Sequence, residues 1–411
     1  MRAKVAVFIG VALIALPAGI LVGRRAGNAR HEDKLSELRA LCAEAQKEAW
    51  SLRRDVTRVR CEERREARAK SAPKTVAPSK TTVPEPPTPK YDFATFQEAM
   101  RRMDWDAALR GVSRDAIEAV LAKNGRTEEL LVAAASTLGD DEAALDYALE
   151  ALQKDPDGPT ALLAGIHRLI KLGEADEALV WIDKLKEADP ANSLPDYYAA
   201  WIKMKKGDLA GGLEELKGAE AKTFISDYVS RSIPGLEAFY REEGCSESMA
   251  KINACAGLRL GHLLPLRDLA EATAEQATEA FDRGEQGSAL SLADHARKLG
   301  DRLAAGSRLL VESFVGFAIE TRALEFERQI YLARGEQAKL EEVERKIANN
   351  RLTVERMKRI GKAGESALVD LSESEAVAYF EGLIRDGEAI AARDLPAVRE
   401  ALEEPDTSTE K

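Results

Sequence analysis

The hydrophobic positions of the chain begin with one uninterrupted apolar run. Residues Val5–Val22 read VAVFIGVALIALPAGILV and contain no charged residue. Eighteen helical residues span about 27 Å, which is close to the thickness of a bilayer core. We therefore expect residues 1–25 to form a single transmembrane anchor. A cleaved signal peptide is the alternative, but the run exceeds the usual apolar region of such a peptide, and Arg24 and Arg25 follow it.

A heptad pattern follows the apolar run within residues 32–70. Its apolar and small residues alternate at spacings of three and four, which is the period of a coiled coil: Leu35, Leu38, Cys42, Ala45, Ala49, Leu52, Val56 and Val59. This spacing predicts a short stalk that would join two parallel chains, and a single charged helix is the alternative. Cys42 would then be either a cross-link between two chains or a buried free thiol.

The pattern ends in a proline-rich segment at residues 71–90, SAPKTVAPSKTTVPEPPTPK. Proline removes a backbone donor and interrupts helices, so we expect an extended linker there. At the other end of the chain, residues 404–411 are polar and predict a disordered tail.

Residues 91–403 have a helical pattern with an internal period of 34 residues. Three segments that begin at Leu138, Leu172 and Lys206 align with one another, and they share small and helix-ending residues: Gly139, Gly173 and Gly207; Ala144, Ala178 and Gly212; Pro156 and Pro190. Glycine favours the left-handed turn that ends a helix, a small residue allows two helices to approach closely, and proline stops a helix. The period therefore predicts paired helices that stack on their neighbours.

This period and these residues resemble the tetratricopeptide repeat family over about residues 125–225. The first helix of each pair departs from the family, because Glu128, Leu162 and Asp196 replace its usual large aromatic residue. The resemblance implies an all-α fold, an α-solenoid of helical hairpins with divergent ends. Beyond it we expect irregular helices over 225–264, two long helices over 307–361 broken near Gly335, and a helical pair over 374–403.

In this family the first helices line a concave surface on which partners bind. Residues 34 apart would form columns across that surface: Leu163 with Tyr197, His167 with Trp201, and Lys171 with Lys205. An apolar and aromatic strip bordered by lysines suits a short peptide with a carboxylate or acidic side chains. The alternative is that Tyr197 and Trp201 pack between helices.

Charge divides the chain into two parts. Residues 1–90 hold 19 Lys and Arg against 10 Asp and Glu, while the remainder holds 41 against 61, a net charge of −20. The acidic body argues against nucleic-acid binding. Because long domains cross membranes largely regardless of their charge, we expect the body to lie outside the cytoplasm.

The sequence contains little material for catalysis. Its four histidines are scattered, and the motifs for phosphate loops, zinc proteases and serine hydrolases are missing. We therefore expect no catalytic, cofactor or metal residues. Cys245 and Cys255 are either a disulfide or two free thiols.

These patterns predict a membrane-anchored scaffold or adaptor that binds a protein partner. An enzyme or enzyme subunit with a site within residues 225–361 is one rival hypothesis, and a purely structural spacer is another.

Overall fold

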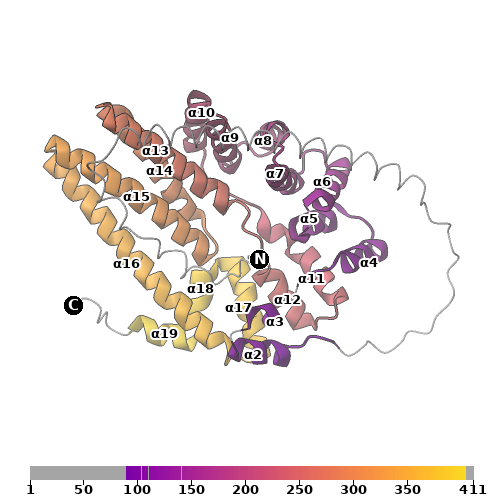
Figure 1. Ribbon diagram of the computed structural model, residues 1–411. Coiled ribbons are helices and arrows are strands. Elements are labelled where there is room, and N and C mark those ends of the chain that lie inside the picture. The colour runs from indigo at the N-terminus through magenta and orange to yellow at the C-terminus, as the bar shows by residue number, and fades with distance from the viewer. Residues whose placement is uncertain (1–88, 103, 110, 140, 404–411) are drawn as a thin grey trace, which may run out of the picture. The chain divides into compact units, whose positions relative to one another are not determined.

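The computed structural model of the chain describes residues 89–403 except 103, 110 and 140 (Figure 1). The apolar run at 5–22, the stalk, nearly all of the linker and the tail at 404–411 lie outside these residues, so the predictions made for them stay predictions. Within the described ranges, no helix is both long enough and apolar enough to cross a bilayer.

The described residues form helices and no strands, which confirms the all-α prediction. Two isolated bridges join Tyr91 to Cys245 and Asn192 to Phe224. The elements are α2 Phe93–Arg101, α3 Trp105–Ala108, α4 Arg114–Asn124, α5 Glu128–Thr137, α6 Asp141–Lys154, α7 Pro159–Leu172, α8 Ala175–Ala188, α9 Leu194–Lys205, α10 Leu209–Glu220, η2 Val229–Ser232, α11 Ile233–Glu242, α12 Glu247–Ala256, α13 Leu263–Asp282, α14 Gln286–Gly306, α15 Leu310–Arg334, α16 Gln337–Leu368, α17 Glu373–Asp386, α18 Glu388–Arg393 and α19 Pro396–Glu403.

The 34-residue pattern corresponds to three pairs of packed helices. Helix α5 packs on α6, α7 on α8, and α9 on α10. The expected left-handed glycines follow two of the first helices, at Gly173 (φ 83°) and Gly207 (φ 84°). The expectation for Gly139 is wrong, because α5 ends at Thr137, the capping residue Leu138 is extended, and the φ of Gly139 is not positive.

Small residues lie where the second helices pack against the first. Ala144 and Ala178 are completely buried. At the matching position of the third pair, a Cβ on Gly212 would lie 2.6 Å from Cγ of Met204. The sequence pattern therefore marks real points of close approach between helices.

The face presented by the first helices is covered by later parts of the chain. Helix α11 packs on α4 and α5, and α13 packs on α9. The contact is close, because a Cβ on Gly235 of α11 would lie 2.5 Å from Cβ of Ala133 in α5. Residues from about 225 to 282 therefore cover part of the surface that the sequence assigned to a partner.

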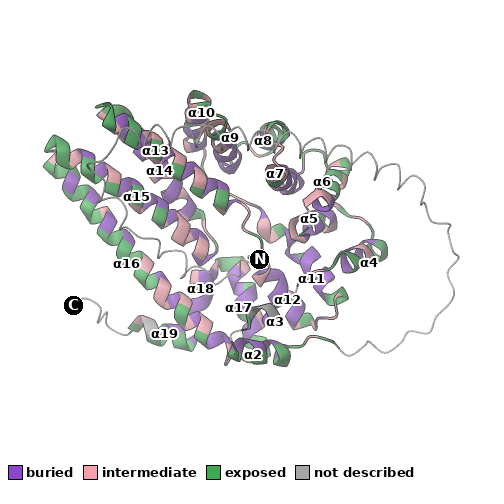
Figure 2. Ribbon diagram, viewed as in Figure 1, coloured by how far each residue is buried: buried purple, intermediate pink, exposed green. Residues whose placement is uncertain are grey.

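The two ends of the described chain share one hydrophobic core. Helix α2 packs on α12, and α12 packs on α17. The Nε2 of Gln97 in α2 also donates a hydrogen bond to the carbonyl of Leu371, at 2.7 Å. Figure 2 shows buried residues on the facing sides of α2, α12 and α17.

The long helices α13, α14, α15 and α16 pack in chain order. Helix α15 ends at Gly335, which adopts the left-handed conformation with φ 67°, as the predicted break required. The predicted helical pair over 374–403 is in fact three helices, α17, α18 and α19. Gly387, with φ 92°, separates the first two of them.

Candidate functional site

The residues predicted to bind a partner do not form one open strip. Leu163 and Tyr197 are 3% and 1% exposed and belong to the core, so neither side chain is presented to a partner. Lys171 and Lys205 are exposed, and His167 and Trp201 are half-buried. Nζ of Lys205 lies 4.5 Å from the centre of the Trp201 ring, and the two form a cation–π contact.

Instead, the inner face of α7 and α9 borders a buried polar cluster that we call the His262 cluster. It consists of His262, Asp227, Glu312, His167 and Tyr198. In the cluster, Nδ1 of His262 lies 3.1 Å from Oδ2 of Asp227, and Nε2 lies 3.1 Å from Oε1 of Glu312. His262 is 3% exposed and Glu312 is 7% exposed. One imidazole therefore lies between two carboxylates away from solvent.

Helix ends hold the three charged members of the cluster in place. His262 directly precedes α13, and Asp227 directly precedes Tyr228 and η2. Glu312 is in the first turn of α15, where its Oε2 accepts hydrogen bonds of 2.9 Å from the backbone N–H groups of Arg308 and Leu309. Those bonds satisfy donors that the start of a helix leaves free, and they fix the carboxylate.

Two members of the cluster come from the repeat-like helices. Nε2 of His167 in α7 lies 2.6 Å from the hydroxyl of Tyr198 in α9, within hydrogen-bond distance. Gly261 lies against the same imidazole, because a Cβ there would be 3.1 Å from Nδ1 of His167. The cluster thus joins α7 and α9 to the segment that covers them and to α15.

The electrostatics of the cluster favour a positively charged His262. Burial alone would lower the pKa of His262, but the negative charges of Asp227 and Glu312, each 3.1 Å from one imidazole nitrogen, outweigh it and raise that pKa to about 10. Burial would raise the pKa of Asp227, yet His262 holds it below the ordinary value of 3.8. Burial and the positive charge of His262 lower the pKa of His167 to about 3, so His167 is neutral.

Asp227, His262 and Glu312 carry the types of side chain that bind metal ions. One ligand atom from each of the three lies within 4.8 Å of the others. However, the two imidazole nitrogens face different carboxylates, and a metal ion can bind only one of these nitrogens. The arrangement therefore matches an imidazolium between two carboxylates better than a metal centre.

We expect the His262 cluster to make the stability of the protein depend on pH. Because the pKa of His262 rises from 6.5 to about 10 on folding, its contribution is complete below pH 6.5 and is lost as the pH rises toward 10. The contribution of Asp227 is present above pH 3.8 and is lost at lower pH. Neutral His167 destabilises the fold as the pH falls below 6.5. Together these shifts put the largest contribution of the cluster near pH 6.5.

Urea unfolding at a series of pH values, followed by circular dichroism, measures this dependence. The wild-type chain should lose more unfolding free energy between pH 6.5 and 10 than the His262→Gln variant. Parallel curves for the two chains would contradict the assignment of a charged His262.

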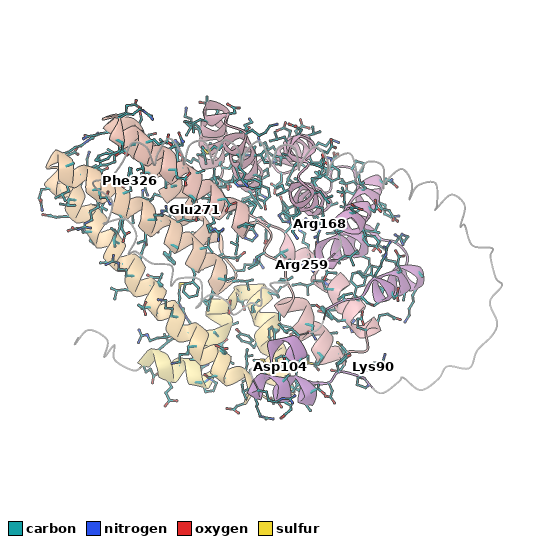
Figure 3. The ribbon with its side chains drawn as sticks, viewed as in Figure 1. Lys90, Asp104, Arg168, Arg259, Glu271 and Phe326 are labelled. Atoms are coloured by element: carbon teal, nitrogen blue, oxygen red, sulfur yellow. The ribbon has the colours of Figure 1, made fainter. Side chains whose placement is uncertain are left out.

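A second buried group explains why Gly139 is not a left-handed cap. Arg168 of α7 is 3% exposed and donates hydrogen bonds to the carbonyls of Ala135, at 2.9 and 2.6 Å, and Ser136, at 3.0 Å. Arg259, before α13, donates to the carbonyl of Leu138 at 3.4 Å. Figure 3 labels both arginines, which lie near one another at the end of α5. Two cations therefore satisfy the carbonyl end of α5 in place of a glycine turn.

Sequence reasoning did not identify the His262 cluster. It treated His262 only as one of four scattered histidines, assigned His167 to the partner-binding strip, and did not single out Asp227 or Glu312. The charged members are 35 and 50 residues apart, and no local spacing marks such a set. Cys245 and Cys255 are both buried and are not joined by a disulfide, so the structure favours the second of the two alternatives for this pair.

Comparison with known proteins finds no protein-family model that matches the chain and no curated protein that matches it.

Proposed function

We propose that the chain is a membrane-anchored helical scaffold that holds a protein partner near the bilayer, with its body outside the cytoplasm. In this proposal the apolar run at 5–22 anchors the chain, the stalk pairs two chains in parallel, and the linker gives reach. A cleaved and secreted form is the alternative arrangement of the N-terminal segment.

The pairing of helices at a 34-residue spacing carries the proposal. Three successive pairs pack in chain order, with buried small residues at Ala144, Ala178 and Gly212. Stacked helix pairs resembling tetratricopeptide repeats provide long surfaces with repeated side-chain positions, which is what a scaffold needs. The finer description of the body as an α-solenoid belongs to this proposal.

Only part of the predicted strip is accessible to a partner. This part, which we call the docking edge, consists of Lys171, Lys205 and Trp201. Lys171 and Lys205 are exposed at equivalent positions of α7 and α9, and Trp201 is half-buried beside Lys205. Each lysine has an acidic neighbour within the chain, Asp141 at 3.6 Å and Asp268 at 3.9 Å. Exposed ion pairs of this kind are weak, so a partner's carboxylate competes well for either lysine.

The rival hypothesis places an enzyme site within residues 225–361. The three charged members of the His262 cluster lie in that range, so the cluster is the candidate for such a site. Converging carboxylates and a histidine are groups used in acid–base chemistry. Here His262 is 3% exposed, and its two nitrogens are both engaged by carboxylates. The cluster therefore supports the packing of the scaffold rather than a reaction with substrate.

Proximity labelling of the full chain in intact membranes tests the proposal. The double variant Lys171→Glu/Lys205→Glu is expected to lose a labelled partner that the wild-type chain retains. Lys184→Glu is the matched control, because Lys184 is an exposed lysine of α8 outside the strip. Alkaline extraction of the same membranes measures whether the chain behaves as an integral protein.

Each outcome has a distinct meaning. Loss of the partner in the double variant alone supports the docking edge. Equal recovery from all three chains would move the partner to another face. Release of the chain by alkali would contradict the anchor.

A further inference from the structure

The second half of α16 is strongly basic on an otherwise acidic body. Residues 345–362, RKIANNRLTVERMKRIGK, contain seven Lys and Arg and one Glu. The rest of the chain after residue 90 contains 34 basic and 60 acidic residues. These eighteen residues therefore carry a net charge of +6 in a body whose remaining residues have an excess of negative charge.

The basic side chains share the exposed side of the helix. Met357 and Ile360 point into the core, at 8% and 1% exposure. The opposite side presents what we call the α16 basic face: Arg345, Arg351, Leu352, Arg356, Lys358 and Lys362. All of them are exposed except Lys358, which is half-buried. Figure 2 shows exposed positions along α16.

Pairing within the chain leaves much of this charge available. Arg351 lies 3.1 Å from Glu325 and Lys358 lies 2.7 Å from Glu355, both as ion pairs that are open to solvent. Such pairs contribute little and exchange readily with other anions. Arg356 and Lys362 have no acidic partner within 4.0 Å among the residues that the structure describes.

An apolar residue lies within the basic face. Leu352 is 60% exposed. On a helix, the residues seven before it and four after it lie on the same side, and these are Arg345 and Arg356. On an anionic membrane surface, the arginines would contact lipid phosphates and Leu352 would insert between the headgroups, as apolar side chains of interfacial helices do.

We infer that the α16 basic face binds the anionic headgroups of the membrane to which the chain is anchored. Each Lys or Arg near an anionic bilayer adds to the attraction, and the contributions of several on one face sum. The basic segment is about 27 Å long and rigid, which suits a flat surface. The remaining acidic surface is repelled by the same lipids, so this face sets the orientation of the body.

The inference rests on the proposed anchor, because that anchor brings the body to the membrane. Residues 23–88 separate the apolar run from the described body. This number of residues is enough for the α16 basic face to reach the membrane surface. A tether of this kind raises the local concentration of lipid headgroups at the face, so weak attraction suffices.

Headgroup quenching in nanodiscs tests the inference with the full chain. One set of nanodiscs contains phosphatidylcholine alone, and a second contains phosphatidylcholine with phosphatidylglycerol. A fluorophore is attached at Ala348→Cys beside the basic face, or at Val180→Cys on α8 as the control, in a Cys42→Ser/Cys61→Ser background. Both labelling positions are exposed, and a quencher is carried on a small fraction of the headgroups.

Quenching at position 348 is expected to rise at least twofold in the anionic discs. It should return to the zwitterionic level in 0.5 M salt and in the Arg345→Glu/Arg351→Glu/Arg356→Glu variant, whose folding is checked by circular dichroism. The Val180→Cys label should not respond to lipid composition.

Equal quenching at position 348 in both lipids would overturn the inference while the anchor stands, and the face would then be assigned to an acidic protein. Failure of the chain to remain with either nanodisc would instead overturn the proposed anchor, and the inference with it.

Discussion

Asp227→Asn is expected to lower the free energy of unfolding by about 3–5 kcal/mol, because it leaves a buried positive charge without one of its two counter-charges. Nδ1 of His262 lies 3.1 Å from Asp227, and the imidazole is 3% exposed. The amide keeps the shape of the carboxylate, so packing changes little and the loss is electrostatic. Urea unfolding at pH 6.5 measures it.

The double variant Asp227→Asn/His262→Gln separates this loss from a general effect of substitution. Removing both charges relieves the unpaired cation, so the double variant should be more stable than the sum of the two single losses predicts. Asp176→Asn is the matched control, because Asp176 pairs with Lys206 on the surface and is 87% exposed in its side chain. Asp176→Asn should lower the free energy of unfolding by at most about 1 kcal/mol. Equal losses from Asp227→Asn and Asp176→Asn would contradict a charged cluster.

The paired helices could be predicted because their signals are local. Gly173 and Gly207 follow helices within a few residues of the apolar pattern that defines them, and both have positive φ. Gly139 has the same sequence context and a different conformation. The carbonyl groups at the end of the preceding helix accept hydrogen bonds from Arg168 and Arg259. These arginines lie 29 and 120 residues beyond Gly139, so no local pattern could have indicated the difference.

The candidate site was beyond prediction for the same reason. Sequence reasoning assigned Tyr197 and Leu163 to an open surface because it placed the first helices of a repeat on a free inner face. That face is covered by α11 and α13, whose sequences carry no sign of where they pack. The His262 cluster forms only when residues 167, 227, 262 and 312 are brought together by this packing.

Adding a single methyl group is expected to lower the free energy of unfolding most where α14 crosses α15. A Cβ on Gly300 would lie 2.5 Å from the backbone nitrogen of Glu320 and 2.6 Å from the carbonyl oxygen of Gly316. A Cβ on Gly316 would in turn lie 2.5 Å from the backbone nitrogen of Ala304. Because backbone atoms have no rotamer to adopt, the helices must separate.

Gly300→Ala and Gly316→Ala are each expected to lower the free energy of unfolding by about 3 kcal/mol or more. Gly287→Ala, in the first turn of the same α14, is the matched control. Apart from its chain neighbours and the backbone of its own helical turn, no atom of the described residues lies within 4 Å of a Cβ placed at Gly287. Gly287→Ala should therefore raise the free energy of unfolding by about 0.5–1 kcal/mol. Thermal and urea unfolding of the three variants measure the difference, and a stabilising Gly300→Ala would contradict the close crossing.

Separation of α14 and α15 should also change the geometry of the His262 cluster. Glu312 precedes Gly316 by four residues on α15 and supplies the carboxylate 3.1 Å from Nε2 of His262. A shift of α15 at Gly316 therefore moves one of the two counter-charges of the buried imidazolium. If the crossing and the cluster are coupled in this way, Gly316→Ala should weaken the pH dependence of stability between pH 6.5 and 10 along with stability itself. A destabilised variant whose pH dependence matches the wild type would show that the crossing acts through packing alone.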